Sequence, residues 1–181
     1  TAIPIRLETR KSNPSHKASS SITATVRNHR SEYCSLSFFF RISWKNDVKT
    51  GLFGDVNAFE LPRLITNTEA RIIGLVGKYF PTGAHKVGAA FGCLVPRLVT
   101  GGFDPTTQKA VWPSTGNYCR GGAFDSVLLD CVPVAILPEG MSQERFDWLK
   151  QIGAEVIATP GTESNVKEIY DKCWEIRRTR P

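Results

Sequence analysis

The sequence lacks the residue spacings that mark several common kinds of site. Its five cysteines include no C-x-x-C pair and it has only three histidines, so we expect no metal site. An odd, scattered set of cysteines is typical of reduced thiols in an intracellular protein. No apolar run reaches the length of a membrane span, and the most apolar stretch, 36–44, is too short. We therefore expect a cytoplasmic protein with no membrane partner.

The motifs of the common nucleotide-binding proteins and hydrolases are missing too. "GLVGKY" at 74–79 is not a P-loop, because Ile72 and Tyr79 stand where that motif needs other residues. No G-x-G-x-x-G occurs, which removes the nicotinamide fingerprint, and no G-x-S-x-G occurs. A thiol–imidazole pair of Cys119 with His85 rests on residue types alone, and a buried structural cysteine is the favoured interpretation.

Positive charge is concentrated in the first part of the chain. Residues 1–50 hold nine Lys or Arg and three Asp or Glu, whereas the remaining residues hold fourteen of each sign. Nucleic-acid binding would need a basic face on the folded part, so we expect no nucleic-acid partner. The Ser- and Arg-rich composition resembles an organelle transit segment, which would change the location; a solvated tail and a faulty gene model are the alternatives. We divide the chain into a poorly structured basic segment of unknown role, 1–57, and an α/β domain, 58–181.

Strand and helix patterns alternate from about Ala70 onward. Strands are predicted at 70–80, 109–113, 132–138 and 154–159. Helices are predicted at 85–98, 118–130 and 142–152, with a last helix that begins near 166. This order predicts β-α-β units and a parallel sheet, in which ligands bind beyond the carboxyl ends of the strands.

Some finer expectations concern the helices. Pro96 should end or kink the first helix. The second helix should bury one apolar side, formed by Phe124, Val127, Leu128 and Cys131. The last helix should bury an apolar series, Val166, Ile169, Tyr170, Cys173 and Trp174, and carry a Glu168–Lys172 pair.

Two loops carry residue types suited to chemistry, "PTGAHK" at 81–86 and "PSTGN" at 113–117. Each follows a predicted strand and precedes a predicted helix, so we expect both at one edge of the sheet, facing one site. Ser114, Thr115 and Gly116 at a helix start would bind an anion, and Asn117 adds a donor and an acceptor. An N-cap turn without a ligand is the alternative.

Lys86 is an unusual residue for the start of a helix, where a cation is locally unfavourable. Burial and the helix N-terminus both favour the neutral amine. A neutral lysine is a nucleophile that condenses with aldehydes. The alternative is a lysine that extends into solvent.

These loops resemble those of the pyridoxal-phosphate enzymes of the tryptophan synthase β-chain and cysteine synthase superfamily. "PTGAHK" is similar to their lysine-bearing loop, "PSTGN" to their substrate-carboxylate loop, and "PEGMSQERFDWLKQIGAEVIATPG" at 138–161 to the cysteine synthase segment that follows. The resemblance covers about 70–175 and implies the three-layer, parallel-sheet N-terminal half of a fold-type II enzyme.

The resemblance also implies roles for particular residues. Lys86 would bind pyridoxal 5'-phosphate and move the substrate α-proton, with His85 near the phosphate. Asn117 would hydrogen-bond the ring oxygen of the cofactor, and Ser114, Thr115 and Gly116 would bind the carboxylate of an amino-acid substrate. The implied reaction is β-elimination or β-replacement, with the pyridine ring as electron sink.

The chain also departs from the family pattern. Phe80 replaces the Asn that often precedes "PTG", Ala84 matches the tryptophan synthase form, and Tyr118 is bulky where the family has a small residue. The second half of the family fold, with its Gly-rich phosphate loop, is not in these residues. We therefore expect the chain alone to bind the cofactor weakly. A catalytically incomplete remnant that acts as an interaction protein is the alternative, and a homodimer is left open as the assembly.

Overall fold

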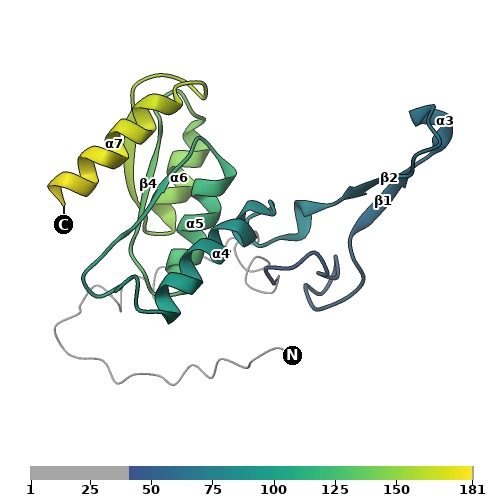
Figure 1. Ribbon diagram of the computed structural model, residues 1–181, viewed down its shortest axis with the longest axis horizontal. Helices are drawn as coiled ribbons and strands as arrows, with labels where there is room; N and C mark the ends of the chain where they lie inside the picture. Colours follow the sequence, from purple (N-terminus) through teal and green to yellow (C-terminus); the bar gives the residue numbers. More distant parts are fainter. Residues whose placement is uncertain (1–40, 181) are drawn as a thin grey trace.

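A three-stranded parallel sheet organises the carboxyl-terminal two thirds of the structure. The computed structural model describes residues 41–180 (Figure 1), so most of the predicted basic segment lies outside the described residues. The strands are β3 (Ala110–Pro113), β4 (Pro133–Pro138) and β5 (Glu155–Thr159), in the order β3-β4-β5. All three were predicted from the sequence. The central strand β4 is buried along its whole length, as its unbroken apolar sequence requires.

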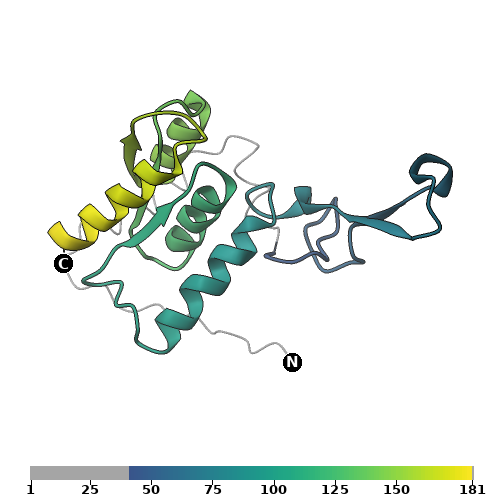
Figure 2. The ribbon, with the colours of Figure 1, turned by 45° about the horizontal axis from the view of Figure 1, so that its top comes forward.

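Helices cover both faces of this sheet and make three layers. They are α4 (Lys86–Val99), α5 (Asn117–Leu128), α6 (Gln143–Gln151) and α7 (Val166–Thr179). Ala135 and Leu137 of β4 pack with buried residues of α4, α5 and α6. Val134 and Ile136 point the other way, against α7. Among the helices of residues 41–180, Figures 1 and 2 show α7 on the face opposite α4, α5 and α6. The α/β three-layer fold predicted from the sequence is therefore confirmed.

The strand that precedes the lysine loop does not join this sheet. β2 (Ile72–Leu75) pairs antiparallel with β1 (Ala58–Leu61), and a short helix, α3 (Arg63–Thr66), connects the two. Figure 1 shows this hairpin projecting from the rest of the fold. The prediction of one strand over 70–80 was wrong in extent, because a 3-10 turn, η1 (Gly77–Tyr79), follows β2. The prediction that both loops follow strands of one sheet was also wrong.

The hairpin exposes apolar side chains on both of its faces. Phe59, Ile73 and Leu75 are each more than half exposed, and Leu64 at the tip is almost fully exposed. A two-stranded hairpin is marginally stable in water unless something covers it. Exposed apolar strands also favour association between chains.

We expect Ile73→Thr to reduce self-association of the purified chain without lowering its thermal midpoint. Threonine keeps the β-branched shape that a strand favours and removes exposed apolar surface. Light scattering against protein concentration measures the effect. Ile136→Thr, at a fully buried site in β4, is the contrasting control and should lower the midpoint. Unchanged scattering in Ile73→Thr would contradict the expectation.

Helix α5 buries a different side from the one that its apolar residues suggested. Its buried residues are small or polar, and Leu128 is half exposed. The reason is close approach: α5 packs against both α4 and β3, so glycines and Ala123 face its neighbours. The apolar side predicted for this helix was therefore largely wrong: Cys131 is buried as predicted, but Phe124 and Val127 are only half-buried.

Two other helix predictions were partly wrong. Helix α4 continues through Pro96 to Val99, and the Pro96 carbonyl still accepts a hydrogen bond from the Thr100 N–H (3.1 Å). In α7, Ile169 and Ile176 are buried, while Val166, Tyr170 and Trp174 of the predicted stripe are about half exposed.

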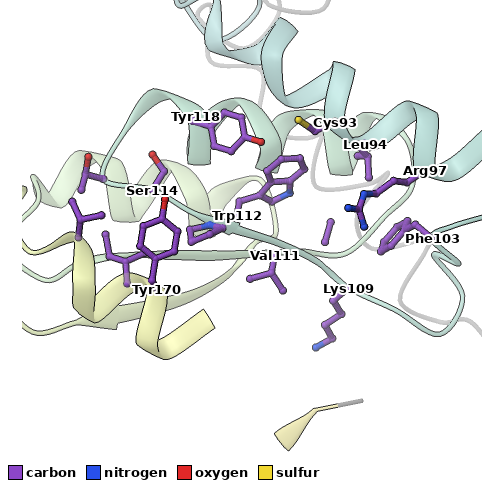
Figure 3. A pocket seen from close by; sticks show the side chains of 15 residues that line it. Cys93, Leu94, Arg97, Phe103, Lys109, Val111, Trp112, Ser114, Tyr118 and Tyr170 are labelled. Atoms are coloured by element: carbon purple, nitrogen blue, oxygen red, sulfur yellow. The ribbon is translucent and has the colours of Figure 1, made fainter. Parts of the chain in front are cut away.

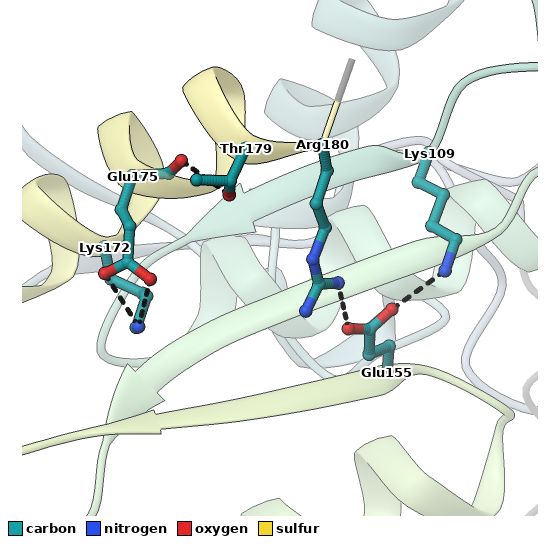
Figure 4. Close-up of polar contacts among 6 residues, drawn as sticks. All are labelled: Lys109, Glu155, Lys172, Glu175, Thr179 and Arg180. Carbon is teal, nitrogen blue, oxygen red and sulfur yellow. Dashed lines mark hydrogen bonds and ion pairs between the residues drawn. The ribbon is translucent and has the colours of Figure 1, made fainter.

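Ion pairs tie α7 to the sheet and to itself (Figure 4). Glu155 on β5 accepts from Lys109 (2.9 Å) and from Arg180, which follows α7. Within α7, Lys172 pairs with Glu175 (2.8 Å) instead of the predicted Glu168. The side chains of these pairs are between 31% and 54% exposed, so solvent screens them and each pair contributes at most about 1 kcal/mol. Among residues 41–180, no helix combines the length and apolarity needed to cross a bilayer.

Candidate active site

Lys86 is the first residue of α4, and both it and His85 are exposed. The turn before them is compact, with Pro81 and Thr82 buried. Gly83 adopts φ +71°, a left-handed conformation that favours glycine. No side chain caps the start of α4. The start of a helix at Lys86 is therefore confirmed, whereas the burial of Lys86 expected from the sequence was wrong, because its side chain extends into solvent.

The second loop leaves the carboxyl end of β3 and leads directly into α5. The Ser114 N–H donates to the Ile136 carbonyl (3.1 Å), which extends the β3–β4 ladder by one residue. The Gly116 N–H donates to the Ser114 hydroxyl (3.3 Å). Asn117, the first residue of α5, is exposed, and no side chain caps this helix start either. Ser114 and Thr115 are half-buried.

Close backbone contact between α4 and α5 brings the two loops near each other. A Cβ on Gly121 would lie 2.7 Å from the Val87 Cα and 3.1 Å from the Lys86 carbonyl carbon. Gly121 is four residues after Asn117, about 6 Å along the helix axis. The backbone of Lys86 therefore lies about one helical turn from the start of α5. The packing of α4 against α5 thus brings the two loops together, whereas the sequence analysis expected a shared edge of the sheet to do so.

Arg145 on α6 fixes the second loop and was not found from the sequence. Its Nη1 donates to the Thr115 carbonyl (3.0 Å), and the side chain is half-buried. Arg120, one turn into α5, stacks over the Trp148 ring at 4.4 Å. Burial lowers the pKa of Arg120. Two guanidinium groups thus flank the start of α5, which favours an anion there.

A groove of about 700 Å³ runs along the free edge of β3 (Figure 3). Arg97 and Cys93 of α4 form one wall, and Tyr170 of α7 lies on the other. Ser114 and Thr115 line its end. Lys86, His85 and Asn117 are not among the lining residues, so the prediction that both loops converge on one pocket is not met by this groove.

Burial perturbs several groups on α5. Asp125 is fully buried, and neither carboxylate oxygen has a partner among the described residues. Burial raises the pKa of Asp125 to about 8. Burial likewise raises the pKa of the Cys119 thiol and of the Tyr118 hydroxyl to about 12. Cys119 is therefore an inert core thiol, and the interpretation that rejected a Cys119–His85 pair agrees with its burial.

The chain is similar in sequence to proteins of known name. A probable cysteine synthase of Bacillus subtilis is 30% identical over 112 residues, which is 62% of this chain and 36% of that protein. The cystathionine beta-synthase of Saccharomyces cerevisiae is 29% identical over 101 residues, 56% of this chain and 20% of the yeast protein. Homologues of this chain thus include cysteine synthases and a cystathionine beta-synthase. No protein-family model matches the chain.

Solved structures agree on the fold. The O-acetylserine dependent cystathionine beta-synthase from Helicobacter pylori superposes with a TM-score of 0.61 at 21% identity, over 68% of this chain and 40% of that one. A pyridoxal 5'-phosphate-dependent aspartate racemase gives 0.57 at 20% identity, over 68% and 37%. The chain thus has the fold of part of these fold-type II enzymes. It spans between 20% and 40% of the length of the four proteins named above.

Proposed function

We propose that this cysteine synthase-like chain supplies the lysine and carboxylate-binding half of a pyridoxal-phosphate site for β-elimination or β-replacement on an amino acid. The observation that carries the proposal is the backbone contact at Gly121, which sets the start of α4, with Lys86, beside the start of α5, with Asn117. The sequence relationship to cysteine synthases supports it.

The residues present fit one end of the cofactor. An exposed lysine amine can bond to its aldehyde, and an exposed asparagine amide can donate to its ring oxygen. Two uncapped helix starts offer free N–H groups to anionic groups. The cofactor, when bound, withdraws electrons from the substrate Cα.

The chain's own groups then have separate tasks. Lys86 would hold the cofactor, and its amine, when not bonded to the cofactor, would carry the proton to and from the substrate Cα. Ser114, Thr115 and Gly116 would orient the carboxylate, with Arg145 fixing their loop through the Thr115 carbonyl. His85 lies next to Lys86 and can donate to the phosphate.

Borohydride reduction tests this proposal directly. Because we expect the chain alone to bind the cofactor weakly, it is incubated with an excess of pyridoxal phosphate, reduced, digested and mapped. We expect the label on Lys86, a visible absorption band before reduction, and loss of both in Lys86→Ala. Lys78→Ala, which removes a nearby exposed lysine, serves as the matched control and should keep the label.

Label on Lys78 or Lys109 would overturn the assignment. No label at any lysine would instead favour the second candidate function, a non-catalytic interaction protein. The observation in favour of that candidate is the uncovered apolar hairpin β1–β2, a surface of the kind that binds other chains.

A further inference from the structure

Residues 41–47, which come before the hairpin, lie against the loop that carries Lys86. Asn46 is fully buried, and both the oxygen and the nitrogen of its side-chain amide form hydrogen bonds. Its Nδ2 donates to the Arg41 carbonyl (2.6 Å) and to the Tyr79 carbonyl (2.7 Å), and its Oδ1 accepts from the Arg41 N–H (3.2 Å). Tyr79 is the last residue of η1, directly before "FPTGAHK". One amide therefore joins this segment to the base of the lysine loop.

Trp44 makes the second connection. Its ring stacks on the His85 imidazole, with centroids 5.5 Å apart and planes 26° apart. The same indole meets Phe80 edge-on at 5.0 Å. Trp44 therefore contacts the residue before the "PTGAHK" turn and the residue that precedes Lys86. The loop is held at both ends by one aromatic side chain.

We propose that Asn46 and Trp44 are positioning residues for Lys86: the amide fixes the Tyr79 end of the loop and the indole fixes His85. The positioning of the loop does not depend on the proposed function, and only the expected effect on cofactor affinity rests on it. Among the described residues, the hydrogen bonds of the loop itself are local, such as the Thr82 hydroxyl donating to the Ala84 carbonyl (3.3 Å). An anchor from outside the loop therefore sets its orientation relative to α5.

The proposal also assigns a role within the segment that the sequence had left as basic and of unknown function. Asn46 has only donors facing the two carbonyl oxygens, so a carboxylate in its place would face oxygens with no proton to share. A leucine in place of Trp44 keeps apolar volume and loses the aromatic face, whereas phenylalanine keeps a face that can stack.

The stack is tested first without any cofactor. Proton NMR of the imidazole signals should show an upfield ring-current shift for His85, assigned with His85→Gln because the chain has only three histidines. We expect Trp44→Leu to abolish the shift and Trp44→Phe to retain part of it. Hydrogen exchange of the amides at 79–88 should be faster in Trp44→Leu and in Asn46→Asp. Lys45→Ala, an exposed neighbour of both residues, is the control and should change neither readout.

Cofactor binding is tested second. We expect the dissociation constant of pyridoxal phosphate to rise about tenfold or more in Trp44→Leu and Asn46→Asp, with Trp44→Phe and Lys45→Ala close to the wild type. Urea denaturation shows whether a weaker affinity comes from unfolding of the variant. If Asn46→Asp does not fold, Trp44→Leu alone tests the proposal. Unshifted His85 signals, or exchange and affinity equal in Trp44→Leu and Lys45→Ala, would overturn the proposal. A wild-type chain that takes up no cofactor would refute the proposed function, while the NMR and exchange results would still decide the positioning role.

Discussion

Asparagine in place of Asp125 is expected to raise the free energy of unfolding by several kcal/mol at pH 8 and to change it little at pH 4. The wild-type carboxyl group is fully buried with no hydrogen-bond partner among the described residues, and burial raises its pKa from 3.8 to about 8. Burying a charge without a partner is costly, whereas a neutral amide of the same shape avoids that cost.

The direction of the pH dependence follows from the raised pKa. The folded state holds the Asp125 proton more tightly than the unfolded state, so this group's stabilising effect is fully present below about pH 4. It is lost as the pH rises toward 8, at about 1.4 kcal/mol per pH unit. Urea denaturation of both proteins from pH 4 to 8 measures the difference. Asp130→Asn, at an exposed position after α5, is the matched control and should keep the wild-type slope. An unchanged slope in Asp125→Asn would contradict the expectation.

Alanine in place of Gly122 is expected to destabilise the fold by about 3 kcal/mol or more. A Cβ at this position would lie 2.0 Å from the Trp112 Cδ2 atom, well inside contact distance. The indole cannot move aside easily, because it is buried in the core of α4, α5 and α6, and its Nε1 donates to the Ser126 hydroxyl (2.9 Å). Overpacking of this kind forces backbone or rotamer shifts.

Gly92→Ala provides the contrast within the neighbouring helix. Apart from its own helix backbone, a Cβ at Gly92 meets no atom of residues 41–180 within 4 Å, so alanine should stabilise α4 by up to about 1 kcal/mol through its helix propensity. Urea denaturation reports both free energies, and near-UV circular dichroism reports the environment of Trp112. Gly122→Ala with wild-type stability would show that α5 can move away from β3, contrary to the packing described above.

The sequence predicted the parallel sheet well because its strands carry uninterrupted local signals. The run at 132–138 became the fully buried β4, and the Ser142 start and the Gly153 stop of α6 lie as predicted, with Gly153 at φ +89°. The fold class depended on these elements, which local patterns specify.

The errors came from contacts between segments that are distant in sequence. The buried side of α5 is set by Gly121 against α4 and Gly122 against Trp112, and small residues give no apolar periodicity to detect. The strand before the lysine loop had the composition of a sheet strand, but its partner β1 lies in a region assigned to the boundary of the domain. Arg145, Trp44 and Asn46 act on the loops from 30 or more residues away, and no local pattern marks them.

The backbone contact between α4 and α5 has a consequence for the entropy of ligand binding. A Cβ at Gly121 would lie only 2.7 Å from the Val87 Cα, so the glycine allows the two helices to pack in direct backbone contact. The start of α4 is therefore immobilised when the helices pack, before any ligand arrives. Ordering two flexible loops during association would subtract from affinity, at about 1–2 kcal/mol for each residue fixed. In this chain, the start of α4 is already ordered when the protein folds. A ligand that bridges the two helix starts would therefore bind with a smaller entropic loss than it would at two independently mobile loops.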